Sequence, residues 1–260
     1  MGKFDGILIC SDWDGTLFDG EKVPEESIKA IRYFQENGGK FTICSGRAPF
    51  YIRKMTSLVK PNTYTLALNG TVIYDTDTEE IVRESFIDDD AYRLALELIE
   101  KSVKIKTVGV CVKEKNEYFW LTPEEFEAKI PELKKFFAYK ITLTTEVQSD
   151  GDRLMLDAEK IEKGKYSVLR SGRGYAEIIL TDTSKGYAAR YLKKLLGARL
   201  LICMGDYEND ISMFECADVS YAPANAIEKI KSLATHITVS VKDAAVAKVI
   251  EDIEKRYLIG

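Results

Sequence analysis

Short apolar runs alternate with amphipathic segments over the first 70 residues of the chain. The runs at 7–10, 41–44 and 64–70 are almost wholly apolar until they end, as strands covered on both faces are. Between them, the segments 24–37 and 49–59 repeat apolar residues at helical spacing. This β-α-β-α-β order predicts an α/β fold with a parallel sheet and right-handed crossovers.

The pattern changes near residue 85 and returns near residue 181. The part between them reads as a mixed α+β stretch of helices and strands. We expect helices at 88–101 and 123–137, a short helical segment near 159–169, and strands near 107–113, 117–120, 140–145, 153–157 and 174–180. After it come a helix at 181–197, a buried strand at 200–206 and a final helix at 242–257. The sequence therefore predicts a core formed by 1–84 and 181–260, with an inserted domain at 85–180.

Composition narrows the classes of protein that this chain can be. Hydrophobic residues make up 45% and charged residues 30% of 260 residues, an ordinary balance for a globular protein. The net charge is −5 without a Lys/Arg-rich block, which argues against nucleic acid or a membrane surface as a partner. There is neither an apolar run long enough to span a membrane nor a signal-peptide pattern, so we expect a cytoplasmic location.

Histidine and cysteine usage restricts the chemistry further. The single histidine, His236, excludes histidine triads and multi-histidine metal sites. The five cysteines are scattered without a C-x-x-C pair, so we expect them to be small core residues. Any acid or base is then a carboxylate, and any metal site is rich in oxygen, which suits Mg²⁺.

Polar clusters stand where predicted strands end or a predicted helix begins. They are Asp12 with Asp14, Ser45, Lys185, and Asp206 with Asp210. Each alone has an ordinary interpretation: a solvated Asp-Gly turn, a helix cap, a surface lysine, and a βα loop. Ligands of open parallel sheets bind outside the carboxyl ends of the strands, and all four clusters fall in order at that edge. We therefore expect them to form one site.

The charges of these clusters suggest phosphoryl transfer. The carboxylates would repel one another unless a divalent cation such as Mg²⁺ lay between them. Lys185 and the Ser45 hydroxyl would bind a phosphate group. Asp12 would then attack phosphorus to form an aspartyl-phosphate, while Asp14 carries the proton to and from the reacting oxygens.

The residues at these positions resemble the haloacid dehalogenase-like (HAD) phosphohydrolases. SDWDGTL, ICSGR, DTSKGYA and GDYENDISMF are similar to the four motifs of that family, in order and across essentially the whole chain. Within that family, the sequence most resembles the Cof-type group. Members of this group also carry an Asn-Gly pair like Asn69-Gly70 and a run like that from Glu177 to Gly186. The resemblance implies a Rossmann-like core with an inserted type IIB cap that closes over the site and selects the substrate.

The resemblance also implies roles for single residues. Asp12 would be the nucleophile and Asp14 the acid and base. The residues implied for phosphate or substrate binding are Ser45, Gly46, Arg47, Asn69, Lys185 and Asn209. Mg²⁺ would be held by the Asp12 side chain, the Asp14 carbonyl and Asp206, with Asp210 supporting the metal or its waters. In the cap, Arg170 and Arg173 are candidates for contacting the remote end of the substrate.

These inferences predict a Mg²⁺-dependent phosphomonoester hydrolase of small phosphorylated metabolites, with sugar phosphates as the leading class. Two alternatives stay open. A phosphosugar mutase of similar fold would return the phosphoryl group to its substrate. A phosphoacceptor or ligand-sensing module would keep the aspartate site with negligible turnover.

Overall fold

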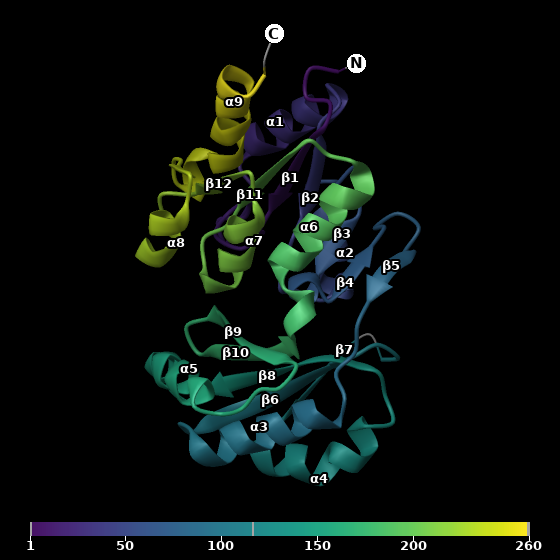
Figure 1. Cartoon of the computed structure of the whole chain (residues 1–260), viewed down its shortest axis with the longest axis vertical. Coiled ribbons are helices and arrows are strands. Elements are labelled where there is room, and N and C mark those ends of the chain that lie inside the picture. Colours follow the sequence, from purple (N-terminus) through teal and green to yellow (C-terminus); the bar gives the residue numbers. More distant parts are fainter. Residues whose placement is uncertain (1, 116, 259–260) are drawn as a thin grey trace. The chain divides into compact units, whose positions relative to one another are not determined.

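A computed structural model describes residues 2–115 and 117–258 of the chain (Figure 1). The chain forms two compact units. Unit 1 comprises Met1–Arg83 and Lys185–Gly260, and unit 2 comprises Glu84–Ser184. In the described part of the chain, no helix is both long and apolar enough to cross a membrane.

Unit 1 is built on a five-stranded sheet in which every neighbouring pair is parallel. In spatial order its strands are β13 (His236–Ile237), β12 (Val219–Ala222), β11 (Leu200–Met204), β1 (Ile7–Ser11) and β2 (Lys40–Ile43). The first strand of the chain thus lies inside the sheet, between two later strands. All five residues of β1 are buried, as its apolar run predicts. The predicted α/β class with a parallel sheet is confirmed.

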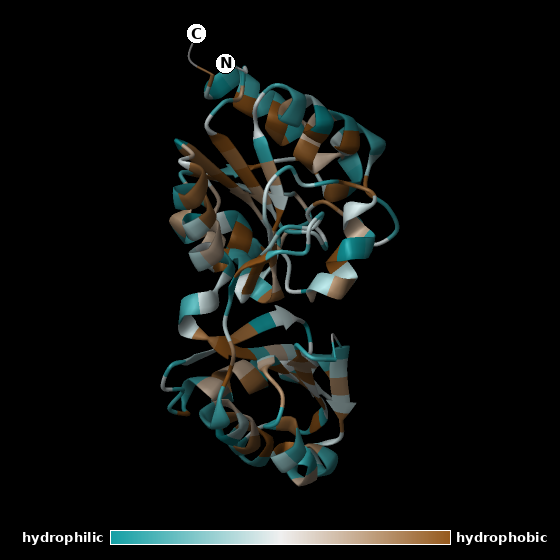
Figure 2. Ribbon diagram, turned by 90° about the vertical axis from the view of Figure 1, so that its right-hand side faces the viewer, coloured by the Kyte–Doolittle hydropathy of each residue, from teal (hydrophilic) through white to brown (hydrophobic). Residues whose placement is uncertain are grey.

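Helices cover the sheet of unit 1 on both faces (Figure 2). One layer contains α1 (Glu25–Glu36) and α9 (Ala245–Arg256), which pack against each other. The other contains α6 (Lys185–Leu196) and α7 (Ile211–Cys216), which both contact β11. Among the described residues of this unit, the other α-helices are α2 (Pro49–Thr56) and α8 (Glu228–Leu233). Apolar residues of α6 and α7 share one buried cluster with alternate residues of β1 and β11, which fixes the beginning of α6 against the sheet.

The third predicted strand differs from expectation. Cys44 and Leu66 form a single parallel bridge, so β3 (Thr65–Ala67) only touches the parallel sheet beside β2. It belongs instead to a three-stranded sheet with β4 (Val72–Tyr74) and β5 (Ile81–Glu84). The cause is local: the η1 turn (Leu68–Gly70), with Leu68 and Asn69 at positive φ, reverses the chain so that β4 pairs antiparallel with β3.

Unit 2 contains a five-stranded antiparallel sheet with helices α3 (Asp89–Lys101), α4 (Pro123–Leu133) and α5 (Gly151–Glu159). In spatial order its strands are β7 (Glu117–Leu121), β6 (Ile105–Val112), β8 (Ala138–Thr145), β10 (Tyr175–Leu180) and β9 (Tyr166–Gly172). The Asp88 side chain caps α3, and Thr122 with Glu125 forms a capping box at α4. Apolar residues of all three helices join those of the strands in one buried cluster.

Two elements of unit 2 were predicted wrongly. The segment 153–157, expected to be a strand, lies within α5. The segment 159–169 was expected to be helical. In the structure α5 ends at Glu159, and β9 begins at Tyr166. Leu154 and Ala158 stand four residues apart and are both buried in the unit 2 cluster, which is the spacing of one helix face. A short apolar run fits both the two-residue period of a strand and the 3.6-residue period of a helix, and tertiary packing decides which forms.

The five cysteines are free thiols, and all but Cys216 are buried. Cys10 on β1 lies opposite Cys203 on the neighbouring strand β11. Burial raises the pKa of the Cys203 thiol, so it is an inert apolar residue rather than a nucleophile. The expectation that the cysteines are core residues holds for these positions.

Candidate active site

The register of the parallel sheet brings the predicted site residues together. Ser11, the last residue of β1, pairs with Met204 on β11 and with Ile43 on β2. The chain continues from these three positions into Asp12, Gly205 and Cys44, so three loops leave the sheet side by side. The Asp12 amide donates to the Met204 carbonyl at 2.9 Å, which ties the first two loops. One sheet edge therefore carries the motifs.

Lys185, the first residue of α6, is at the centre of the charged cluster. Its side chain is fully buried, and Nζ lies 2.6 Å from Oδ1 of Asp12 and 2.6 Å from Oδ1 of Asp210. The next residue must be glycine, because a Cβ on Gly186 would lie 1.9 Å from the Ser212 carbonyl oxygen. The Lys-Gly pair thus lets α6 begin close to α7 and holds the ammonium group between two carboxylates.

Burial and mutual repulsion shift the ionisation of this cluster. Burial raises the pKa of Asp12 well above its usual range, although the nearby Lys185 charge opposes that shift. Burial and the Asp210 carboxylate raise the pKa of Asp206 to about 7. Burial alone would lower the pKa of Lys185, but Asp12 and Asp210 raise it, so the lysine stays charged. One ammonium group faces three carboxylates, and the site favours a further positive charge.

Backbone amides hold the two later aspartates. Oδ2 of Asp210 accepts from the amides of Asp206 at 2.9 Å and Tyr207 at 3.1 Å. Gly205 permits this turn, since a Cβ there would lie 2.4 Å from Cβ of Asp210. Asp210 therefore uses one oxygen for the loop and the other for Lys185. This arrangement makes it a bridge between η4 (Glu208–Asp210) and α6.

The donor set fits a hard divalent cation. Asp12, Asp206 and Asp210 each offer a carboxylate oxygen, and these oxygens all lie within 4.8 Å of one another. The cluster contains oxygen ligands only, is largely buried, and carries excess negative charge. Mg²⁺ prefers such ligands and few of them, with water and phosphate oxygens completing its shell. Three of the four residues predicted as metal ligands are thus gathered at one point.

The fourth, Asp14, directs its carboxylate elsewhere. Both of its oxygens accept from Arg47, with Nε and Nη2 at 2.8 Å, in a bidentate pair. Both side chains are nearly half exposed. Arg47 was predicted to bind phosphate or substrate, and the structure places its guanidinium on the predicted acid and base instead. The carbonyl of Asp14, not its carboxylate, was the predicted metal ligand, and that role stays a prediction.

Replacing Arg47 with alanine is expected to change the free energy of unfolding by less than about 1 kcal/mol. Because the Arg47–Asp14 pair is exposed to water and screened by salt, its bidentate geometry orients the two side chains but adds little to the free energy of unfolding. Urea denaturation of Arg47→Ala beside the parent protein measures this. A loss of several kcal/mol would show that the pair is a structural element of the fold.

The remaining predicted binding residues form a second group around Ser45. Ser45 is buried. Its hydroxyl accepts from the Arg47 amide at 3.2 Å, and the Ser45 backbone carbonyl accepts from the Asn69 amide at 3.0 Å. Asn69 takes the left-handed conformation, at φ 56°, and its Oδ1 accepts from Nδ2 of Asn209 at 3.1 Å. Gly46 allows Asn69 to approach, because a Cβ there would lie 3.2 Å from Asn69 Oδ1. These contacts join the loop after β2 to η1 and η4.

Sequence reasoning missed two residues that hold the first motif in place. Thr16 donates its hydroxyl to Oδ1 of Asp206 at 2.9 Å, and it could have been found because it follows the Asp-Gly turn directly. Asn225 donates to the Gly15 carbonyl at 2.7 Å, and its Oδ1 accepts from the Val241 amide at 2.8 Å. No spacing in the sequence pointed to Asn225, which acts from a loop that is distant in the chain.

In unit 2, the guanidinium of Arg170 is ion-paired with Asp152 and also donates to the carbonyls of Gly172 and Arg173. The structure thus assigns Arg170 to loop contacts within its own unit. The predicted contact of Arg170 and Arg173 with substrate stays a prediction.

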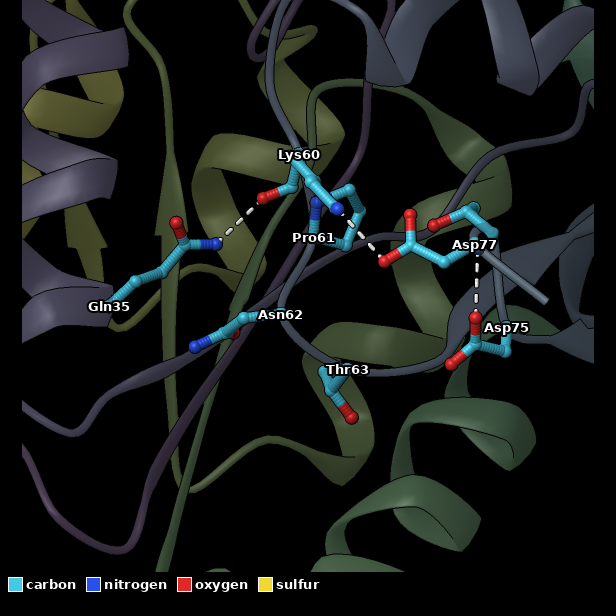
Figure 3. Close-up of a pocket in the computed structure, with 8 residues that line it drawn as sticks. Gln35, Lys60, Pro61, Asn62, Thr63, Asp75 and Asp77 are labelled. Carbon is cyan, nitrogen blue, oxygen red and sulfur yellow. Dashed lines mark hydrogen bonds and ion pairs between the residues drawn. The ribbon is translucent and has the colours of Figure 1, made fainter.

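A cavity of 340 Å³ lies elsewhere in unit 1 (Figure 3). It is lined by Gln35, Lys60, Pro61, Asn62, Thr63, Asp75, Thr76 and Asp77. Lys60 pairs with Asp77 at 2.8 Å, and Gln35 donates to the Lys60 carbonyl at 2.8 Å. None of the predicted site residues lines this cavity, and the Asp75 carboxylate accepts from the backbone amides of Asp77 and Thr78. Chemistry and sheet topology, rather than cavity size, identify the candidate site.

Comparison with protein families and curated sequences identifies the family that the chain resembles. The family model described as haloacid dehalogenase-like hydrolase matches residues 9–250. A Bacillus subtilis (strain 168) protein named "Putative phosphatase YxeH" is 30% identical, over 95% of this chain and 97% of the relative. Phosphoglycolate phosphatase 2 of Saccharolobus solfataricus is 25% identical, over 95% of this chain and 92% of the relative.

Solved structures share the fold. A haloacid dehalogenase-like hydrolase from B. subtilis superposes with a TM-score of 0.78 at 22% identity, covering 94% of this chain and 98% of that one. The sugar phosphatase BT4131, of HAD subclass IIB, superposes with a TM-score of 0.74 at 19% identity, covering 95% and 98%. At this identity the likeness concerns the fold alone.

Proposed function

Because the chain belongs to the haloacid dehalogenase-like hydrolase family, as one of its phosphatases, we propose that it is a Mg²⁺-dependent phosphomonoester hydrolase of small phosphorylated metabolites. Sugar phosphates are the leading substrate class. The observation that carries the proposal is the buried Lys185 ammonium held at 2.6 Å from both Asp12 and Asp210, with Asp206 beside them. The cytoplasm is its proposed location.

The family was predicted from four sequence motifs, and that prediction is confirmed by the family model and the curated relatives. The predicted fold, a Rossmann-like core with a IIB-type cap, is confirmed by the solved structures. Within this fold, unit 2 is proposed as the cap that selects the substrate.

In the first proposed step, a carboxylate oxygen of Asp12 attacks the phosphorus of the substrate. The bond from phosphorus to the ester oxygen breaks, and Asp14 gives a proton to the leaving alkoxide. Lys185 keeps Asp12 oriented through the 2.6 Å contact and places a positive charge beside the transferring group. Arg47 must leave the Asp14 carboxylate before that proton transfer, and a phosphate dianion competes for its guanidinium.

In the second proposed step, Asp14, now a carboxylate, takes a proton from water. The water oxygen forms a bond to phosphorus while the bond from phosphorus to Asp12 breaks. Inorganic phosphate leaves, and Asp12 is restored. The Ser45 loop, fixed by Asn69 and Asn209, is the proposed contact for the phosphate oxygens.

A bound Mg²⁺ would supply charge neutralisation for the transferring phosphoryl group. Its proposed ligands among the side chains are Asp12 and Asp206, with Asp210 supporting it while it holds Lys185. Thr16 orients Asp206 through its hydroxyl.

Chelation with EDTA is therefore expected to abolish phosphate release, and added Mg²⁺ to restore it. Mg²⁺ should also raise the melting temperature, since a ligand at 100 times its Kd adds about 2.7 kcal/mol. Asp206→Asn should lose most of this thermal response. The control is Asp77→Asn, an exposed carboxylate paired with Lys60, which should respond like the parent protein. Activity indifferent to EDTA would refute the proposed metal dependence.

The two alternatives differ from this proposal in what they require. A phosphosugar mutase needs a bisphosphate activator, whereas the proposed phosphatase releases phosphate from a generic aryl phosphate without one. A sensing module would accept the phosphoryl group and turn over negligibly. Steady phosphate release through many turnovers separates the proposed enzyme from both.

A further inference from the structure

The chain crosses between the two units at two places, and a side-chain contact within unit 1 joins them. Unit 1 gives way to unit 2 after Arg83, and unit 2 gives way to unit 1 before Lys185. Lys185 is the first residue of α6 and belongs to the candidate active site. Arg83, on β5, reaches the same turn of this helix, because its Nη1 donates to the Tyr187 hydroxyl at 2.8 Å.

The Arg83 guanidinium also lies against two tyrosine rings of α6. Its Cζ lies 4.5 Å from the ring centroid of Tyr187 and 5.7 Å from that of Tyr191. The two tyrosines are four residues apart, so they are neighbours on one face of the helix. Val82 and Tyr191 both pack against the apolar cluster of unit 1 that contains Leu192. The contact therefore combines a hydrogen bond with cation–π attraction, which suits a planar guanidinium.

Glu84, the residue after Arg83, is held in the other unit. Its Oε2 accepts from the Tyr139 hydroxyl at 2.8 Å, and its carboxylate also pairs with Lys113. Tyr139 and Lys113 both belong to unit 2. Two consecutive residues are thus fastened to different units, and the contact of Arg83 with α6 anchors the chain where it leaves unit 1.

Three consecutive residues tie the first turn of α6 to different parts of unit 1. Lys185 reaches the buried carboxylates of the candidate site. The Gly186 amide donates to the Ser212 hydroxyl at 3.1 Å, which ties the turn to α7. Tyr187 accepts from Arg83, which ties the turn to β5. Because the helix begins at Lys185, contacts with neighbouring elements, rather than a preceding helical turn, position this end.

We propose that Arg83 is a positioning residue for Lys185. It fastens the first turn of α6 to β5 and so keeps the ammonium group beside the transferring phosphoryl group. This inference rests on the proposed function, in which Lys185 supplies that positive charge. Displacing a group by about 1 Å can lower a rate by about 100-fold. Since the other two contacts of the turn would stay in place, the loss of Arg83 should cause a smaller displacement and a smaller fall in rate.

Steady-state kinetics of the whole chain with p-nitrophenyl phosphate and Mg²⁺ test the inference. Arg83→Met should lower kcat by about tenfold, while KM changes by less than about threefold, because the ammonium group acts mainly in the transition state. Tyr187→Phe keeps the ring but removes the hydroxyl acceptor, so kcat should fall by about threefold. The double variant should be about as slow as Arg83→Met alone, because both substitutions remove the same contact.

Arg190→Met is the matched control, because Arg190 is an exposed arginine on the same helix, and kcat should not change. Thermal melting of each variant separates positioning from folding, with kcat measured well below the melting temperature. A near-parental kcat in Arg83→Met, whatever its melting temperature, would overturn the inference. Effects of the two substitutions that multiply in the double variant would overturn it as well.

These outcomes differ from a failure of the proposed function. If the parent protein releases phosphate and the Arg83 variant does so at the same rate, the positioning role fails and the proposed function stands. No phosphate release by the parent protein, with Mg²⁺ present, would instead count against the proposed function.

Discussion

Asp12→Asn is expected to lower the rate of phosphate release by at least about 10⁴-fold while the protein stays folded. The amide cannot attack phosphorus, and no other carboxylate of the cluster is in the same position: Asp210 is committed to Lys185 and two backbone amides. The amide oxygen can still accept from Lys185. Because burial already disfavours the Asp12 charge, the neutral side chain should cost about 1 kcal/mol of stability or less.

Phosphate release under saturating substrate and Mg²⁺ measures the rate, and circular dichroism with thermal melting checks the fold. Asp77→Asn serves as the control for the same chemical change at an exposed position of unit 1. An Asp12→Asn variant that keeps a near-normal rate would exclude Asp12 as the nucleophile.

Lys185→Met should cause the largest loss of stability among the variants proposed for this site. Lys185 is fully buried between Asp12 and Asp210, and both carboxylates would stay behind without their partner. Removing one member of a buried ion pair costs about 3–5 kcal/mol. Phosphate release should vanish as well, since the variant lacks the positive charge beside the transferring group.

The matched control is Lys193→Met, on the same helix. Lys193 pairs with Asp218 at 2.6 Å, but its side chain is partly exposed. Its loss should cost about 0–1 kcal/mol. Guanidinium chloride unfolding of both variants, in EDTA, gives the two free energies. Similar values for the two lysines would mean that the buried cluster does not hold the start of α6.

The site could be predicted because strand ends carry their own signal. Apolar runs that stop at Asp12, Ser45 and Asp206 fix both the strand and the place where it leaves the sheet. Their proximity then follows from the parallel register, in which Ser11 lies between Ile43 and Met204. The role of Lys185 could not be inferred from its neighbouring residues alone. Its position in the chain, between the Ser45 and Asp206 motifs, identified it as a site residue.

Features that depend on tertiary contacts could not be predicted. The Arg47 side chain contacts Asp14 while its backbone amide donates to the Ser45 hydroxyl, and the sequence alone does not say where the guanidinium points. Asn225 holds the Gly15 carbonyl from a loop with no motif of its own. In unit 2, the apolar residues of 153–157 fit a strand or a helix, and only packing against the sheet makes them helical.

The central claim is that Asp12 forms a covalent bond to phosphorus, and trapping that intermediate tests it most directly. Substrate turnover is stopped with borohydride, which reduces an aspartyl-phosphate to homoserine, and peptides are sequenced by mass spectrometry. We predict homoserine at position 12 in the parent protein with substrate, and none without substrate or in Asp12→Asn. Homoserine at another aspartate, or at no position while turnover proceeds, would contradict the account.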